Sequence, residues 1–195
     1  MHSRQIAQWT VHLQCDDPGL ADGVFALLEE VVANGQPLED GKTIQAGWST
    51  LILKASTDGF HVLTANIRPD GALALGPELT GSLTVTRAQM HVAARTGIAP
   101  QDTNDRQYVA IAKGVLDHHA VVLQRQEAQF EGDSGWRIRS AESHEPPDYE
   151  AVPSYQLLAQ RPSLLSALAI PTDYMVVFEG KRIDAILDPY DRNLW

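Results

Sequence analysis

The sequence predicts an α+β protein with mainly antiparallel sheets and a few packed helices, arranged as two small domains. Apolar segments that alternate in polarity or are rich in β-branched residues predict strands at 7–15, 44–53, 60–67, 108–113, 120–125, 136–140 and 174–187. Between the first two segments, apolar residues recur at helical spacing from Leu20 to Val32. A polar stretch without periodicity, 98–107, predicts a linker between domains 1–100 and 104–195.

The first strand and the first helix have clear boundaries. The odd-numbered residues of 7–15 are apolar and share one face of the strand, so Cys15 is expected to be a buried core thiol. Asp17 can cap the helix, with Pro18 at its first position and Gly35 at its end. The pattern predicts an amphipathic helix packed on a sheet.

Turn residues organise the rest of the first domain. Residues 57–59 (Thr-Asp-Gly) are expected to join 44–53 and 60–67 into a β-hairpin, and a second turn is expected at 68–71 (Arg-Pro-Asp-Gly). Thr86 and Gln89 match a capping box, which predicts a short helix over 87–95 that ends at Gly97.

The second domain is predicted to be rich in strands. The alternation along 136–140 places Trp136 and Ile138 inward and Arg137 and Arg139 outward. Three prolines predict an irregular loop over 141–153, followed by short helices at 154–160 and 163–169. The segment 174–187 is expected to form two strands around a turn at 180–181 (Gly-Lys).

The charge balance limits the classes of partner. The net charge is −10, from 25 acidic and 15 basic residues, which disfavours direct binding to nucleic acid or to an anionic membrane. Seven acidic residues lie between positions 127 and 150, opposed only by Arg137 and Arg139. This cluster is either a solvated loop surface or a binding face for a basic partner.

Cysteine usage and hydropathy favour a cytoplasmic protein. Cys15 is the only cysteine, so neither an internal disulfide nor a Cys-x-x-Cys metal site can form. The N-terminal segment lacks a continuous apolar run, and no stretch reaches the roughly 18 apolar residues of a membrane span.

Residues 132–135 (Gly-Asp-Ser-Gly) match the loop around the nucleophile of trypsin-like proteases, which raises the alternative of a hydrolase that uses Ser134. Such a serine needs a histidine base, a carboxylate and donors for the oxyanion. Trp136 stands where those enzymes have a further glycine, and its side chain would crowd the oxyanion loop. The other interpretation is a turn that places Trp136 in the core.

Two histidine-containing segments are candidate metal sites. The first is 117–119 (Asp-His-His), in which adjacent histidines on a strand would point to opposite faces. The second is His144 with Glu142 and Glu145, in a proline-containing loop. Neither pattern is specific, and the sequence contains no phosphate-binding glycine-rich loop, so we expect no metal and no cofactor.

The second half resembles immunity protein family 33 of bacterial polymorphic toxin systems over about residues 108–178. The residues that carry the resemblance are 108–113, 121–125 with Glu127, 131–137 (Glu-Gly-Asp-Ser-Gly-Trp-Arg), Ser140, Glu142, Tyr149, 164–171 and 177–179. Ala141 and Thr172 depart from the family, which usually has glycine at the corresponding places. The first half is not covered by the resemblance and is expected to be an accessory domain.

The resemblance implies a protein that binds and neutralises a cognate toxin by stoichiometric occlusion and is not an enzyme. The open alternative is a housekeeping ligand-binding or scaffold protein. The expected partner-binding residues are Glu127, Glu131, Glu142, Glu145, Asp148, Tyr149 and Glu150. The expected structural motif consists of Asp133, Ser134, Gly135, Trp136 and Arg137.

Overall fold

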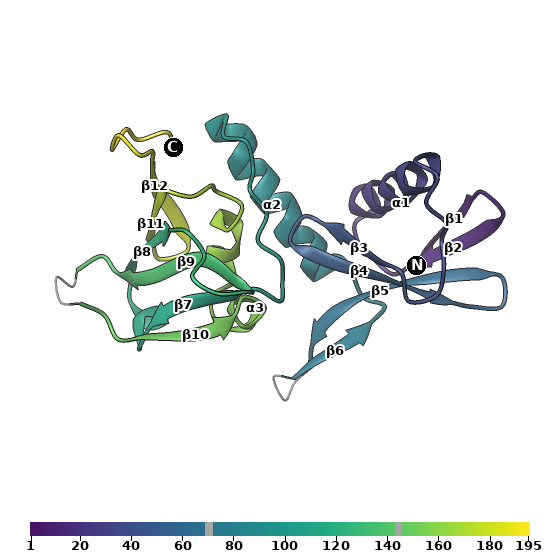
Figure 1. Cartoon of the computed structure of the whole chain (residues 1–195), viewed down its shortest axis with the longest axis horizontal. Coiled ribbons are helices and arrows are strands. Elements are labelled where there is room, and N and C mark those ends of the chain that lie inside the picture. Colours follow the sequence, from purple (N-terminus) through teal and green to yellow (C-terminus); the bar gives the residue numbers. More distant parts are fainter. Residues whose placement is uncertain (69–71, 143–145) are drawn as a thin grey trace. The chain divides into compact units, whose positions relative to one another are not determined.

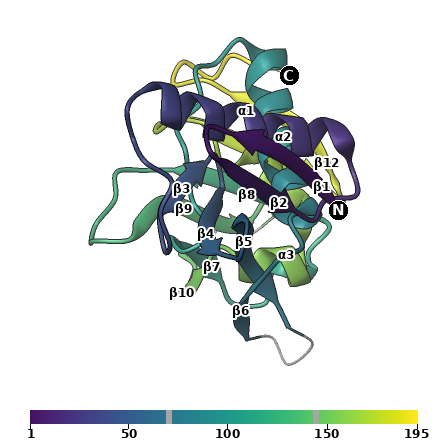
Figure 2. The same ribbon diagram turned by 90° about the vertical axis from the view of Figure 1, so that its right-hand side faces the viewer.

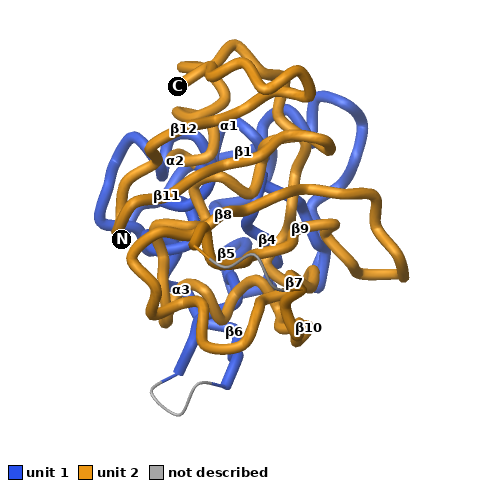
Figure 3. The backbone as a smooth tube through the Cα atoms, turned by 90° about the vertical axis from the view of Figure 1, so that its left-hand side faces the viewer, with its two compact units in different colours: residues 1–86 blue, residues 87–195 orange. Residues whose placement is uncertain are grey.

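In the computed structural model the chain forms two compact units, residues 1–86 (unit 1) and residues 87–195 (unit 2) (Figure 3). The structure describes residues 1–68, 72–142 and 146–195. Each unit is built on one six-stranded sheet and carries helices, so the α+β prediction is confirmed. The division falls within helix α2 (Thr80–Thr96), which contributes its first half to unit 1 and its second half to unit 2.

Unit 1 combines a mixed sheet with one long helix. Its strands follow the order β1-β2-β5-β4-β3, with β6 paired to β5, and only the β2–β5 pairing is parallel. The elements are β1 (His2–Ile6), β2 (Trp9–Leu13), α1 (Pro18–Ala33), β3 (Thr43–Ala46), β4 (Ser49–Ala55), β5 (Gly59–Ile67) and β6 (Leu73–Gly76).

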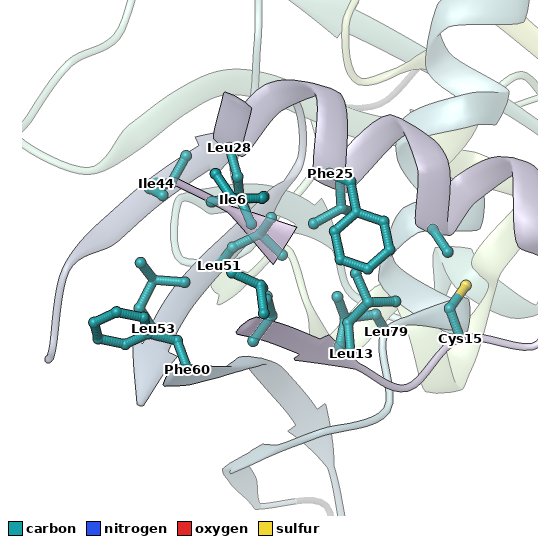
Figure 4. Packing of buried hydrophobic residues seen from close by; sticks show 14 of the residues in the cluster. Ile6, Leu13, Cys15, Phe25, Leu28, Ile44, Leu51, Leu53, Phe60 and Leu79 are labelled. Carbon is teal, nitrogen blue, oxygen red and sulfur yellow. The ribbon is translucent and has the colours of Figure 1, made fainter. Parts of the chain in front are cut away.

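Helix α1 lies along one face of this sheet and buries the core of unit 1 (Figures 1, 2 and 4). The predicted cap is confirmed, because the Asp17 carboxylate accepts hydrogen bonds from the backbone N–H groups of Gly19 and Leu20. Cys15 is 3% exposed and lies in the core, as expected. The β4–β5 hairpin is also confirmed.

Turns change the bounds of two predicted strands of unit 1. The predicted strand 7–15 is confirmed in its central part as β2, but it starts only at Trp9 because Ala7 adopts φ +51° in the tight turn between β1 and β2. Residues 44–53 are divided into β3 and β4 at Gly47, which adopts φ +59°. The predicted turn at 68–71 lies largely outside the described residues.

Helix α2 starts earlier than predicted, and the proposed capping box does not exist. Thr86 lies inside the helix, where its hydroxyl donates to the carbonyl of Ala46. Gln89 is buried and donates to the carbonyl of Leu165, 2.9 Å away. The predicted end is correct, because Gly97 follows the helix with φ +70°.

Unit 2 is a six-stranded sheet in the order β10-β7-β9-β8-β11-β12, in which only β7 and β9 are parallel. Its remaining helical elements are short. The elements are β7 (Tyr108–Ala112), η1 (Val115–Asp117), β8 (Ala120–Arg125), β9 (Asp133–Ser140), β10 (Tyr149–Pro153), α3 (Gln156–Gln160), η2 (Pro162–Ala167), β11 (Met175–Glu179) and β12 (Arg182–Leu187).

Trp136 and Ile138 are fully buried and form the centre of the unit 2 core, as the alternation predicted. The Trp136 indole N–H donates to the carbonyl of Leu168, so the ring is both packed and hydrogen-bonded. The β11–β12 hairpin is confirmed, with Gly180 at φ +58° in its turn.

Two segments of unit 2 are more ordered than the sequence suggested. The stretch 98–107 packs within unit 2, where Thr103 and Asp105 are buried. Residues 149–153, expected to be loop, form β10 at the edge of the sheet. Pro153 is tolerated there because an edge strand has one side without ladder hydrogen bonds.

Candidate partner-binding surface

The glycine-serine motif is a bulge in strand β9. Along the parallel β7–β9 pair, Tyr108 lies opposite Asp133 and Ala110 lies opposite Arg137, so the step from one pair to the next takes two residues on β7 and four on β9. Gly135 lies in this bulge with φ +80°. A Cβ atom there would lie 2.0 Å from the carbonyl oxygen of Gln126, so the approach of the two backbones requires glycine.

Ser134 is engaged in the same bulge. It is 4% exposed, and its hydroxyl donates to the carbonyl of Tyr108 at 2.6 Å and accepts from the backbone N–H of Trp136. A serine nucleophile instead gives its proton to a general base. The geometry therefore supports the interpretation of residues 132–135 as a structural turn.

A buried ion pair fixes the far side of the bulge. The Arg137 guanidinium donates to both carboxylate oxygens of Asp133, at 3.0 and 2.8 Å. The backbone N–H groups of Gln129 and Gly135 donate to the same carboxylate. The hydrogen bond from Arg137, aided by these two N–H groups, lowers the pKa of Asp133 from 3.8 to about 2.

We expect Asp133 to stabilise unit 2 in a pH-dependent way. Its folded pKa lies below its unfolded pKa, so this stability is present above pH 3.8 and is lost as the pH falls toward 2. The shift corresponds to ~2 kcal/mol of unfolding free energy. Asp133→Asn should therefore be less stable than the wild type at pH 7 in urea unfolding, and the difference should shrink as the pH falls from 4 toward 2. The exposed Glu131→Gln is the control, and a difference that stays constant with pH would contradict the prediction.

A groove of about 380 Å³ lies on the sheet face beside this ion pair. Its floor includes the small residues Ala110 and Ala151, and Tyr108, Phe130 and Tyr149 line it as well. The three aromatic side chains are 40%, 53% and 38% exposed, respectively. The rings of Tyr108 and Phe130 are 6.3 Å apart. The groove therefore combines exposed aromatic surface with the charged pair Asp133–Arg137.

The structure separates the predicted acidic residues into two groups. Glu127 and Glu131 are exposed in the loop between β8 and β9, whereas Glu142 follows β9 and Asp148 precedes β10. The length of β9 places these groups roughly 20 Å apart. Glu150 is exposed in β10, next to Tyr149, and Glu145 lies outside the described residues.

The region with this groove also carries the family match. The family model of the Imm33-like domain matches residues 88–189, which is more than half of the chain. The chain belongs to the Imm33-like family. No curated protein and no solved structure matches it. The Imm33-like match includes every strand of unit 2, and the groove lies wholly within it.

The histidines of the Imm33-like region do not gather around a metal position. The ring nitrogen Nδ1 of His118 lies 3.1 Å from the Ser140 hydroxyl, while the His119 ring lies near Gly180. Among the described residues, no group of three or more His, Cys, Asp or Glu side chains could hold a metal ion. His144 is outside the described residues.

Outside the Imm33-like match, unit 1 contains a Ser-His-Asp hydrogen-bond chain that sequence reasoning missed. The Ser3 hydroxyl lies 2.8 Å from Nδ1 of His12, and Nε2 of His12 lies 3.1 Å from the Asp58 carboxylate. In the catalytic triad the serine contacts Nε2 and a buried aspartate contacts Nδ1, which is the opposite arrangement. The Asp58 side chain is 59% exposed. This arrangement fits a surface network that links β1, β2 and the β4–β5 turn.

The aromatic residues Tyr108 and Phe130 were also missed as site candidates, because they are 22 positions apart and only the folded loop brings them together. The indication available in the sequence was that each of these large aromatic residues stands next to a polar stretch.

Within residues 1–68, 72–142 and 146–195, none of the helices has the length and apolar character needed to cross a membrane.

Proposed function

We propose that this Imm33-like protein binds a cognate toxin and neutralises it by stoichiometric occlusion. The proposed interface is the groove of unit 2 with the acidic residues at its two ends. Membership of the Imm33-like family supports a role in immunity to a toxin. The geometry of the groove supports the choice of surface.

The observation that carries this proposal is the aromatic groove around a fixed arginine. Tyrosine and arginine dominate the binding energy of many interfaces, particularly where they surround a small pocket. Tyr108, Tyr149 and Arg137 meet this description, and the bidentate contact with Asp133 holds the Arg137 guanidinium in place. Such preorganisation reduces the entropy that is lost when a partner binds.

The charge at the two ends of the groove favours a basic toxin surface. Glu127 and Glu131 lie at one end of β9, and Glu142 and Asp148 lie near the other. Glu150 stands between the groove residues Tyr149 and Ala151 in β10, so it points to the opposite face of the sheet. Only Asp148 of these five makes an ion pair within the described residues, with the exposed Lys113. Exposed carboxylates at the rim of an interface raise the association rate with a basic partner.

Co-expression with the cognate toxin tests the proposal. Tyr149→Ala and the reversals Glu127→Lys/Glu131→Lys and Glu142→Lys/Asp148→Lys should each weaken protection of growth. In binding assays with purified proteins, we expect Tyr149→Ala to weaken the complex by about 2 kcal/mol, roughly thirtyfold in Kd. The two reversals should mainly slow association and should lose their effect at high salt.

The matched control is Glu30→Lys/Glu39→Lys, which changes the net charge equally at exposed positions of unit 1. It should protect as well as the wild type. Equal loss in the control and the groove variants would contradict the proposed surface. Ser134→Ala addresses the hydrolase alternative: loss of a measurable esterase or protease activity in this variant would overturn occlusion. A protein that neither rescues growth nor binds the neighbouring gene product would favour the housekeeping alternative.

A further inference from the structure

A second hollow in unit 2, of about 350 Å³, has a cationic rim and an apolar floor. It lies between the last turns of α2, the turn that joins β11 to β12, and Trp195. In Figure 1 the end of the chain lies beside β12 and the last turns of α2. Ala88, His91, Val92 and Arg95 face the hollow together because they recur at helical spacing. Ser166 of η2 also lines the hollow, so four segments of the chain build it.

The cations at its rim are not neutralised by the protein. Arg95, Lys181 and Arg182 are exposed, as is His91, and within the described ranges none of them makes an ion pair with a carboxylate. Elsewhere in unit 2, Lys113, Arg137 and Arg192 are paired with Asp148, Asp133 and Asp188. Three exposed cations without an ion pair therefore lie around one hollow of a chain whose net charge is −10. They create a local positive potential on an acidic protein.

The floor and one wall of the hollow are apolar. Val92 and Phe178 are buried beneath it, and Ile183 is half-buried beside them. The Arg95 guanidinium lies over the Trp195 ring, with its central carbon 3.8 Å from the ring centroid. A guanidinium held on an aromatic ring keeps its N–H donors at its edges, where they can form a fork with a phosphate.

We propose that this hollow binds a small organic phosphate of the nucleoside phosphate class. The phosphate contacts Arg95, Lys181 and Arg182, and the apolar body of the ligand packs against Ile183. Arginine side chains bind phosphate in a bidentate geometry, and three cations match a dianionic group better than a single carboxylate. A volume of about 350 Å³ exceeds the space needed by inorganic phosphate and lies at the low end of small-molecule pockets. This activity is separate from toxin binding and does not depend on it.

Calorimetric titration of the full chain at low ionic strength tests the proposal. The probes are adenosine and uridine monophosphate, the two parent nucleosides and inorganic phosphate. We expect at least one nucleotide to bind at least tenfold more tightly than its nucleoside and than inorganic phosphate. Lys181→Glu/Arg182→Glu should weaken nucleotide binding at least tenfold. Trp195→Ala removes the ring that holds the Arg95 guanidinium, so it should weaken the binding of nucleotide and of inorganic phosphate alike.

The control variant is Arg106→Glu/Lys113→Glu, which makes the same change in net charge at exposed positions of unit 2 that do not line the hollow. It should bind nucleotide as the wild type does. The proposal is overturned if neither nucleotide binds, if the control weakens binding as much as the rim variant, or if inorganic phosphate binds as tightly as the nucleotides. Circular dichroism and urea unfolding establish that each variant is folded, and Arg182→Gln replaces the double variant if that one is not.

Discussion

Gly135→Ala should destabilise unit 2 by on the order of 3–5 kcal/mol, one of the two largest effects expected for a single substitution in this chain. Two causes combine. The backbone of Gly135 has φ +80°, which costs an alanine roughly 1–2 kcal/mol. The new Cβ atom would also lie 2.0 Å from the carbonyl oxygen of Gln126, so the two strands must separate. That movement breaks the hydrogen bond from the Gln126 N–H to the Gly135 carbonyl and displaces Trp136.

Gly132→Ala is the matched control for this prediction. Gly132 also has a positive φ, +88°, but a Cβ atom there would have Tyr108 Cδ2 as its nearest neighbour, at 3.7 Å, which is an ordinary contact. It should therefore lose only the roughly 1–2 kcal/mol that the backbone conformation costs. Urea unfolding of both variants separates the two contributions. Equal losses in the two variants would show that the close approach to Gln126 is unimportant.

Replacement of Arg125 by methionine should be comparably severe. Arg125 is 4% exposed, and its guanidinium donates to the carbonyls of Gln101, Asp102, Ser134 and Ile170. Burial lowers its pKa to about 10, and the nearby Asp102 opposes this shift, so the group stays charged at pH 7. Methionine fills a similar volume but leaves four carbonyls without this donor. We expect a loss on the order of 3–5 kcal/mol in unfolding free energy.

Two further substitutions test this explanation. Arg125→Lys keeps the charge but cannot bond four carbonyls in a planar fork, so it should recover only a minor part of the loss. Arg139→Met is the control, because Arg139 is half-buried and its only hydrogen bond among the described residues is to the carbonyl of Ser140. It should change stability by less than about 1 kcal/mol. If Arg125→Met unfolds at the same urea concentration as Arg139→Met, the proposed role of the carbonyl contacts is wrong.

Local patterns predicted most elements of the fold but not their ends. The alternation around Trp136 and the glycine at position 180 act over a few residues, and both predictions were confirmed. The first half of α2, Thr-Gly-Ser-Leu-Thr-Val-Thr, has low helix propensity, so nothing local indicated its start at Thr80. Burial of Leu83 and Val85 favours the helix there. β10 was missed because Pro153 is compatible with a strand only at the edge of a sheet, a position that the sequence does not show.

The sequence did not predict that residues 98–107 are ordered or that the groove exists, because both depend on contacts between residues far apart in the chain. The carbonyls of Gln101 and Asp102 are ordered by Arg125, more than 20 positions away. The sequence shows that acidic residues cluster between positions 127 and 150. Only the structure shows that strand β9 separates them into two groups, one at each of its ends. The groove combines side chains of β7, β9, β10 and a loop, and no single window of the sequence contains them.

The division of the chain inside α2 has a consequence for the exchange of modules between related genes. The Imm33-like match begins at residue 88, whereas the helix begins at Thr80 and its first half supplies Leu83 to the core of unit 1. A recombination point at the start of the match would cut this helix, but Leu83 would stay with unit 1, and the buried Gln89 and Val92 would stay with unit 2. Such an exchange preserves both cores provided that the new sequence continues the helix across the junction.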